Sequence, residues 1–431
     1  MAVKRLTDGH GEVPAGNTDW LFTLLVAVSF WGWLAKDFFL DIFLLPLAEG
    51  KLAATAVALL VPLFIAGRLP GRIKARNIPE PQSIPLLFVF FFYCAMSGFL
   101  SGDDAFTRFK LQNLLISMVL GCLLAGKTIR AITINKVHFL GVGILVGAAG
   151  RFFIFNDLSR YSTAIGLREV PMAHLNIQDF YVVLFLAATA LLFSGPFRAV
   201  RLLIWVGTAA ISLPTAIALN SRMLPFTLGV TLIYMVVALR SVMLRSSNVV
   251  RNLLLVSSVA AAGIILVSES LDTESRMMSV FELGIVESYA GDPRPISFAE
   301  AVNDFVVSPI DGIGFGKFLF PGSHPDPTDR LSGGWPHNLF LELLSELGLI
   351  GFVIFLIPFA PLLKKILFVK FGSNNESVVF PALAFVYVVA TMQLTQNIYY
   401  PVFWLFYLCC HVASQRADWN VEERFGPPEA L

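Results

Sequence analysis

Long runs without a charged residue recur along this chain and limit its fold more than any other feature. The segments 202–219, 252–268 and 347–363 are three of them, and each approaches the roughly 20 residues with which a helix crosses a bilayer core. Hydrophobic residues make up 56% of the 431 residues and charged residues 14%, and the mean hydropathy is +0.73. Soluble globular domains are far less apolar. The sequence therefore predicts an all-α, polytopic membrane protein.

About twelve spanning helices are expected, arranged as one helical bundle over residues 1–431 without an internal repeat. No small-residue cleavage site follows the first apolar segment, so we interpret that segment as an uncleaved anchor. An even number of spans then places both termini in the cytoplasm. The expected spans are residues 20–35, 52–67, 84–102, 111–126, 137–150, 177–193, 202–219, 223–239, 252–268, 347–363 and two within 377–415.

The distribution of Lys and Arg agrees with this topology, because loops kept in the cytoplasm are enriched in these residues. They fall in alternate loops, as the twelve-span arrangement requires. The segment 269–336 carries four basic and eleven acidic residues, so it is predicted to be a large periplasmic loop. The basic residues of the predicted cytoplasmic loops are Arg68, Arg72, Lys74, Arg76, Lys127, Arg130, Lys136, Arg198, Arg201, Arg240, Arg245, Arg251, Lys364, Lys365 and Lys370.

A short amphipathic helix is expected inside the large loop. Its apolar residues recur at helical spacing opposite Glu300, Asn303 and Asp304; they are Ile296, Phe298, Ala299, Val302, Phe305 and Val306. This helix is predicted to lie either on the bundle or in the membrane interface. The next segment, SPIDGIGFGKF at 308–318, is rich in Gly and Pro and is expected to form turns.

Several functional classes lack a signal in this sequence. The four cysteines lie in apolar runs outside the large loop, so no disulfide framework is indicated, and no Cys/His spacing typical of zinc sites occurs. A net charge of +1 gives no support for nucleic-acid binding. We expect neither a metal nor a cofactor. The cysteines are Cys94, Cys122, Cys409 and Cys410.

Two arginines stand out by their positions as candidate catalytic residues. Arg222 lies in a short outer turn between two charge-free runs, where a charge is costly unless it pairs or faces a polar cavity. The alternative is an interfacial arginine that reaches lipid headgroups. Arg294 precedes the amphipathic helix between two prolines. It could equally be an exposed loop arginine paired with a nearby acid.

His337 is the third candidate. It is expected in the first turn of an uninterrupted apolar helix, directly after Pro336. The field of a helix N-terminus favours a neutral imidazole, and the free N–H groups of that end form an anion site. A hydrogen-bonded interfacial histidine is the alternative interpretation.

Together these residues suit a lipid diphosphate donor. Guanidinium groups bind phosphate in a bidentate manner, and a neutral histidine can deprotonate a hydroxyl. Arginine would stabilise the departing diphosphate while histidine activates an acceptor alcohol. Arg160 and Arg168, in the preceding outer segment, either extend a cationic path for substrate or meet anionic membrane lipid. Polar residues between the last two spans either bind sugar hydroxyls or cap helix ends; they are Gln393, Gln396 and Asn397.

Residues 215–360 resemble the O-antigen ligase and O-antigen polymerase superfamily of bacterial membrane glycosyltransferases. The stretch PHNLFLELLSELGLIGFVIFL is similar to that family's histidine-asparagine signature, which ends its large periplasmic loop and leads into a helix with paired glycines, here Gly348 and Gly351. SPIDGIGFGKF resembles its Pro- and Gly-rich element. NSRML resembles its short Ser-Arg motif, with Met223 where the family often has glycine.

The resemblance implies an inverting, metal-independent transfer of a glycan from undecaprenyl diphosphate to a sugar hydroxyl, at the periplasmic face of the bacterial inner membrane. It implies that Arg222 and Arg294 hold the diphosphate, that His337 is the base and that Asn338 belongs to the substrate site. The acceptor would be lipid A-core for an O-antigen ligase. For a polymerase of O-antigen or exopolysaccharide it would be another lipid-linked repeat unit.

Two other functional classes remain as alternatives. A transporter or flippase of a lipid-linked glycan also requires about twelve spans and cationic residues. The sequence shows no internal twofold repeat and no pair of broken helices at the midplane, which are common in transporters. A structural scaffold for an envelope assembly would give Arg222 no role.

Overall fold

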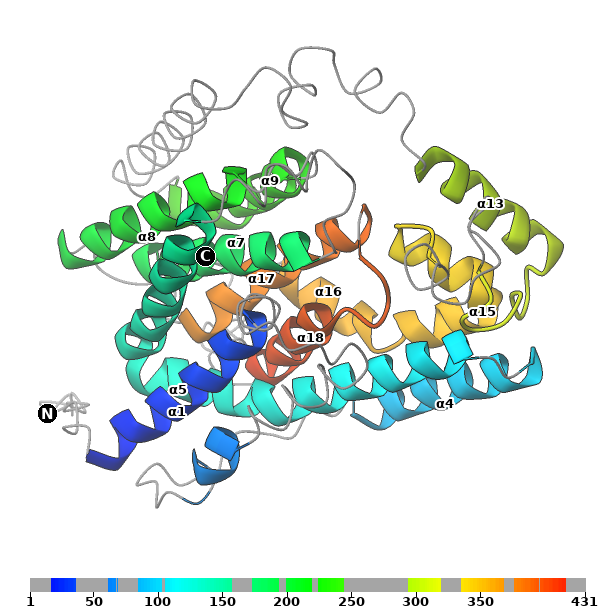
Figure 1. Ribbon diagram of the computed structural model, residues 1–431, viewed down its shortest axis with the longest axis horizontal. Coiled ribbons are helices and arrows are strands. Elements are labelled where there is room, and N and C mark those ends of the chain that lie inside the picture. The colour runs from blue at the N-terminus through cyan, green and yellow to red at the C-terminus, as the bar shows by residue number, and fades with distance from the viewer. Residues whose placement is uncertain are drawn as a thin grey trace, which may run out of the picture.

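The computed structural model describes residues 17–35, 61–66, 68, 84–102, 105–156, 173–193, 199–218, 224–243, 294–318, 335–367, 376–394 and 396–415. Within these ranges the secondary structure is helical, without strands, which confirms the predicted all-α fold. The helices shown in Figure 1 are α1 (Asn17–Leu34), α4 (Ile84–Leu100), α5 (Ala105–Asn156), α7 (Ala173–Phe193), α8 (Ala199–Ala218), α9 (Leu224–Met243), α13 (Arg294–Val307), α15 (Leu339–Leu356), α16 (Phe359–Leu367), α17 (Glu376–Met392) and α18 (Pro401–Ser414).

Three described segments are long and apolar enough to cross a membrane, namely Ala105–Arg151, Ala199–Ala216 and Leu339–Leu356. The chain is therefore a helical protein of membrane type. Shorter apolar helices occupy Asp19–Leu34, Ile84–Leu100, Ile177–Leu192, Phe226–Met235, Val378–Met392 and Pro401–Ser414. The number of about twelve spans stays a prediction, because residues 52–60 and 252–268 lie outside the described ranges.

The predicted loop at 127–136 is wrong. α5 is helical on both sides of Asn135, the one residue within it that adopts a non-helical conformation, with φ −152° and ψ 82°. Asn135 Oδ1 accepts a hydrogen bond from the backbone nitrogen of His138 at 3.1 Å, as a residue that caps a new helix does. Two of the expected spans are therefore joined directly at Asn135, and in Figure 1 the two parts of α5 run in different directions.

α5 is the central helix of the bundle, because α1 and α18 both pack against it. Trp31 of α1 is fully buried, and its indole nitrogen donates a hydrogen bond to the backbone oxygen of Phe139 at 2.8 Å. A Cβ atom at Gly143 would lie 2.5 Å from the Trp31 ring, so only glycine permits this approach. Small residues allow such close helix contacts in membrane proteins. This packing holds the part of α5 that follows Asn135 against α1.

The charge-free stretch 377–415 forms two helices, α17 and α18, joined by a turn. Both are shorter than the helices that are long enough to cross a membrane, so the two spans expected there stay a prediction. The predicted amphipathic helix and the turns after it are confirmed. The amphipathic segment forms α13, and residues 308–318 form turns after it.

Candidate functional site

Three charged side chains are buried together near one end of α5. Lys110 Nζ lies 2.6 Å from Glu342 Oε1 and 2.7 and 2.6 Å from the two carboxylate oxygens of Glu346. None of the three side chains is more than 1% exposed. The ammonium group also lies 4.8 Å from the centroid of the Phe315 ring. Charges so deeply buried persist only when they are paired and hydrogen-bonded.

Two backbone groups complete this charged cluster of Lys110, Glu342 and Glu346. The amide of Gly316 donates to Glu346 Oε2 at 3.0 Å, and the amide of Ile398 donates to Glu342 Oε2 at 2.9 Å. Each carboxylate thus has one backbone donor in addition to the single cation that the two share. The cluster therefore joins α5, α15, the 308–318 turns and the turn between α17 and α18.

Asn338 adds a further contact on the same face of α15, because residues 338, 342 and 346 are spaced four apart. It is the N-cap of α15: its Oδ1 accepts a hydrogen bond from Leu341 N at 3.0 Å. Its Nδ2 donates to the backbone oxygen of Gln393 at 3.0 Å. Both ends of the Asn338 amide are thus used within the protein, and they fix the start of α15 to the α17–α18 turn.

His337 does not lie in the first turn of α15, contrary to the sequence prediction. The helix begins at Leu339 after the Asn338 cap, so Pro336 and His337 both precede it. Among the non-glycine residues that the structure describes, His337 alone has a positive φ, 56°, a conformation that is uncommon for residues other than glycine. The imidazole packs edge-on against Trp335, with ring centroids 5.5 Å apart. A strained residue held by its neighbours is typical of functional sites.

α15 is also not uninterrupted, because it breaks at Gly348, which has φ 61° and ψ −165°. The 308–318 turns supply the backbone partners that the break removes. The amides at 349 and 350 donate to Pro309 O at 2.9 Å and Ile310 O at 3.0 Å, and the carbonyls at 345 and 346 accept from Ile313 N and Gly314 N, both at 2.9 Å. A Cβ atom at Gly348 would lie 2.4 Å from the backbone of Ile310. Glycine is therefore required at position 348 by its positive φ and by the close approach of the Ile310 backbone.

A second polar cluster joins α7 to α17 and to the residue before α18. Asp179 of α7 is buried and accepts hydrogen bonds from Tyr387 at 2.6 Å and from the Tyr400 hydroxyl. The side-chain oxygens of Gln178 and Asn397 are buried without a protein hydrogen-bond partner among the described residues. Ionisable groups within apolar helices are costly and usually mark functional regions.

Asp304 of α13 interacts electrostatically with Glu346 of the charged cluster. Its burial, together with the negative charges of Glu300 and Glu346, raises the pKa of its carboxyl to about 6. Asp304, Glu300 and Glu346 therefore form an acidic group where α13 meets α15. The positive charge that a bound diphosphate requires would come from other residues. One of them, Arg294, is the first residue of α13.

The structure describes His337, Asn338 and Arg294 of the predicted site. Arg222, Arg160 and Arg168 lie outside the described residues. α13 packs against α15, as Figure 1 shows, so the helices that follow Arg294 and His337 are neighbours. The meeting of the two predicted arginines with His337 remains a prediction.

Lys110, Glu342 and Glu346 were missed in the sequence. The expected spans 111–126 and 347–363 begin directly after Lys110 and Glu346, because charge-free runs define them. The spacing of Asn338, Glu342 and Glu346 on one helical face is the signal that could have identified the two glutamates.

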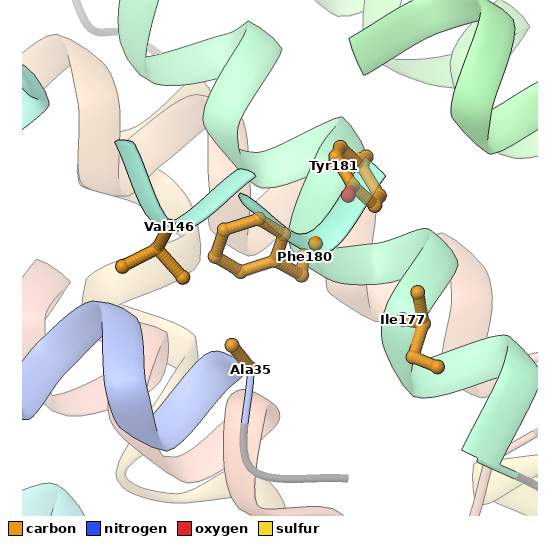
Figure 2. Close-up of a pocket in the computed structure, with 6 residues that line it drawn as sticks. Ala35, Val146, Ile177, Phe180 and Tyr181 are labelled. Carbon is orange, nitrogen blue, oxygen red and sulfur yellow. The ribbon is translucent and has the colours of Figure 1, made fainter. Parts of the chain in front are cut away.

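The cavity in Figure 2 is a different feature. It lies between α1, α5 and α7, is lined by Ala35, Val146, Gly150, Ile177, Phe180 and Tyr181, and has a volume of about 10 Å³. This is room for about one water molecule, and the lining is apolar. It is too small for a sugar or a diphosphate.

Among the described residues no group of three or more His, Cys, Asp and Glu could hold a metal ion. No family model matches the chain, and no curated protein sequence matches it.

Proposed function

We propose that the protein is a membrane glycosyltransferase that moves a glycan from undecaprenyl diphosphate to an acceptor sugar hydroxyl, as an O-antigen ligase or as a polymerase of O-antigen or exopolysaccharide. The acceptor is lipid A-core or a second lipid-linked repeat unit. His337 takes the proton of the acceptor hydroxyl. The bond between the anomeric carbon and the diphosphate breaks as the new glycosidic bond forms, with inversion, and the diphosphate leaves with both electrons.

The placement of His337 carries this proposal. It stands directly before the capped end of α15, in a strained backbone conformation, and Asn338 fixes the next residue to the α17–α18 turn. A base must be held in a defined position to remove a proton from a bound hydroxyl. Asn397 lies in the α17–α18 turn to which Asn338 is hydrogen-bonded, and its buried side-chain oxygen has no protein partner among the described residues. This suits an acceptor rich in hydroxyl groups.

The packing supports a site on one side of the membrane. The 308–318 turns contact α4 through Ser97, α5 through Thr107 and α15 through Glu346. These are the helix ends that the Lys and Arg pattern assigns to the periplasmic side of the inner membrane. In this proposal the twelve spans, the cytoplasmic termini and the large loop 269–336 follow that assignment.

The arginines supply the electrostatic part of the mechanism. Arg222 and Arg294 hold the diphosphate and stabilise the charge that develops on it. Arg160 and Arg168 extend this path toward the donor headgroup. No metal is required in this scheme, because guanidinium groups neutralise the leaving group.

A transporter of lipid-linked glycan is the second candidate, and the break of α15 beside buried charges favours it. Broken helices in transporters expose backbone groups that bind substrate or ions. In α15 the groups freed at Gly348 are bonded to residues 309–314. They are not available to a ligand in this conformation, which favours the transferase.

Reconstituted protein distinguishes the two functions. Proteoliposomes would receive a labelled undecaprenyl diphosphate glycan and candidate acceptors in the presence of EDTA. A transferase forms a glycosidic product and releases undecaprenyl diphosphate. Label that crosses the membrane without product formation would identify a transporter and reject the proposal.

Substitution of the arginines tests their role. Arg222→Ala and Arg294→Ala are each expected to reduce product formation at least about 100-fold, with the protein still folded in the membrane. Arg240→Ala, on the predicted cytoplasmic side, is the matched control and should retain activity. Full activity in both outer variants would reject the diphosphate clamp.

A further inference from the structure

One face of α13 is apolar and exposed. Ile296, Val302 and Val306 are 57%, 47% and 68% exposed, and Val307 follows them in sequence. α13 contributes no charged residue to this face, although the exposed Asn303 lies within it. Solitary exposed apolar residues are common on proteins, but a contiguous group marks a contact surface.

The opposite face of α13 is the one that meets the bundle. Ser297 and Ala301 are buried there, and α13 packs against α15. Glu300 and Asp304 are partly buried at the edge between the two faces. The exposed apolar residues are therefore not needed to hold α13 on α15.

The exposed face of α13 continues onto a candidate membrane span. Ile310, 64% exposed, follows α13, and its carbonyl accepts a hydrogen bond from Ile350 N of α15 at 3.0 Å. Ile350, its neighbour Leu349 and Val353 are exposed apolar residues of α15. The outward residues of a helix that crosses a membrane contact acyl chains. The surface of α13 is thus joined to a surface whose partner is lipid.

We propose that the α13 apolar face, made of Ile296, Val302, Val306, Val307 and Ile310, contacts the acyl chains of the bilayer. α13 is then an interfacial helix that sets the depth of the α15 break and of the segment before α15. Amphipathic helices in this position bury an apolar face below the headgroups and keep charged residues at the boundary, as Glu300 and Asp304 do here. The inference holds whether the protein is a transferase or a transporter.

Spin labels on the intact protein in phospholipid nanodiscs test the contact. Nitroxides would be attached at Val302→Cys, Val306→Cys and Ile310→Cys in a Cys122→Ser background, since the other three cysteines are fully buried. Molecular oxygen concentrates in acyl chains and a neutral nickel chelate stays in water, so their collision rates report the surroundings of each label. Glu300→Cys, at the edge of the face, is the matched control.

The three face positions should collide more often with oxygen than with the nickel chelate, and the ratio should reverse at the control. More frequent collisions with the chelate at all four positions would show a water-exposed face and overturn the proposal. Low collision rates with both reagents at the face positions would show that protein covers the face, which also overturns it.

Discussion

Removal of Lys110 should destabilise the fold strongly. In Lys110→Met, two carboxylates that each lie about 2.6 Å from the ammonium lose their one shared cation. Among the described residues, the amides of Gly316 and Ile398 remain as backbone donors to them. Breaking a buried ion pair from one side costs about 3–5 kcal/mol, because an uncompensated charge remains in a low dielectric. We expect the free energy of unfolding to fall by about that amount.

Reversible unfolding in mixed micelles of increasing SDS content, followed by the fluorescence of the seven tryptophans, measures this change. Lys127→Met, a partly buried lysine further along α5, is the matched control and should lose less than about 1 kcal/mol. The triple variant Lys110→Met/Glu342→Gln/Glu346→Gln removes every charge of the cluster. It should be more stable than Lys110→Met, because no unpaired charge is left.

Either of two results would refute this reasoning. One is a loss of less than about 1 kcal/mol in Lys110→Met, the range of a surface ion pair. The other is a triple variant no more stable than Lys110→Met, which would mean that charge balance is not what the cluster provides.

Three further predictions concern single residues. Gly348→Ala should lower the free energy of unfolding by about 2 kcal/mol or more in the same assay, because Gly348 has a positive φ and lies against the backbone of residue 310. The control Gly207→Ala, where an added Cβ meets no atom within 4 Å, should be neutral or stabilising. Equal effects of the two substitutions would contradict this. Asn338→Ala should lower the free energy of unfolding by about 1 kcal/mol in this assay, because the helix cap is lost. Asn338→Asp keeps the accepting oxygen and should lose less. The raised pKa of Asp304, about 6, means that the fold favours the protonated carboxyl, so its stabilising contribution is present below the ordinary pKa near 4 and lost as pH rises through about 6. Thermal unfolding at pH 5 and pH 7 should therefore differ less in Asp304→Asn than in the wild type, and an unchanged difference would exclude this carboxyl as a cause.

Hydropathy predicts the helices of this chain well because each span needs only its own apolar residues. The same criterion fails at their ends. The expected spans were drawn to exclude Lys110 and Glu346, because charged residues were assigned to the loops. Both are buried, since they pair with each other across 236 residues of the chain. The spacing of Asn338, Glu342 and Glu346 marks a polar face on one partner, but no pattern in the sequence connects that face with Lys110.

Backbone breaks were also hard to predict. The segment 127–136 looked like a loop because of its basic residues, but its helix is interrupted only at Asn135. Conversely, the break at Gly348 falls within an apolar run, and it depends on backbone partners from residues 309–314. Long-range backbone pairing, rather than local composition, decides where these helices end.

The rate of glycosidic product formation by His337→Ala tests the central claim most directly. It would be compared with the wild type in matched proteoliposomes that contain equal amounts of folded protein. Loss of a general base should lower the rate by about 100-fold or more, while the unfolding profile stays close to that of the wild type. A rate within about twofold of the wild type would contradict a catalytic role for His337 and the mechanism built on it.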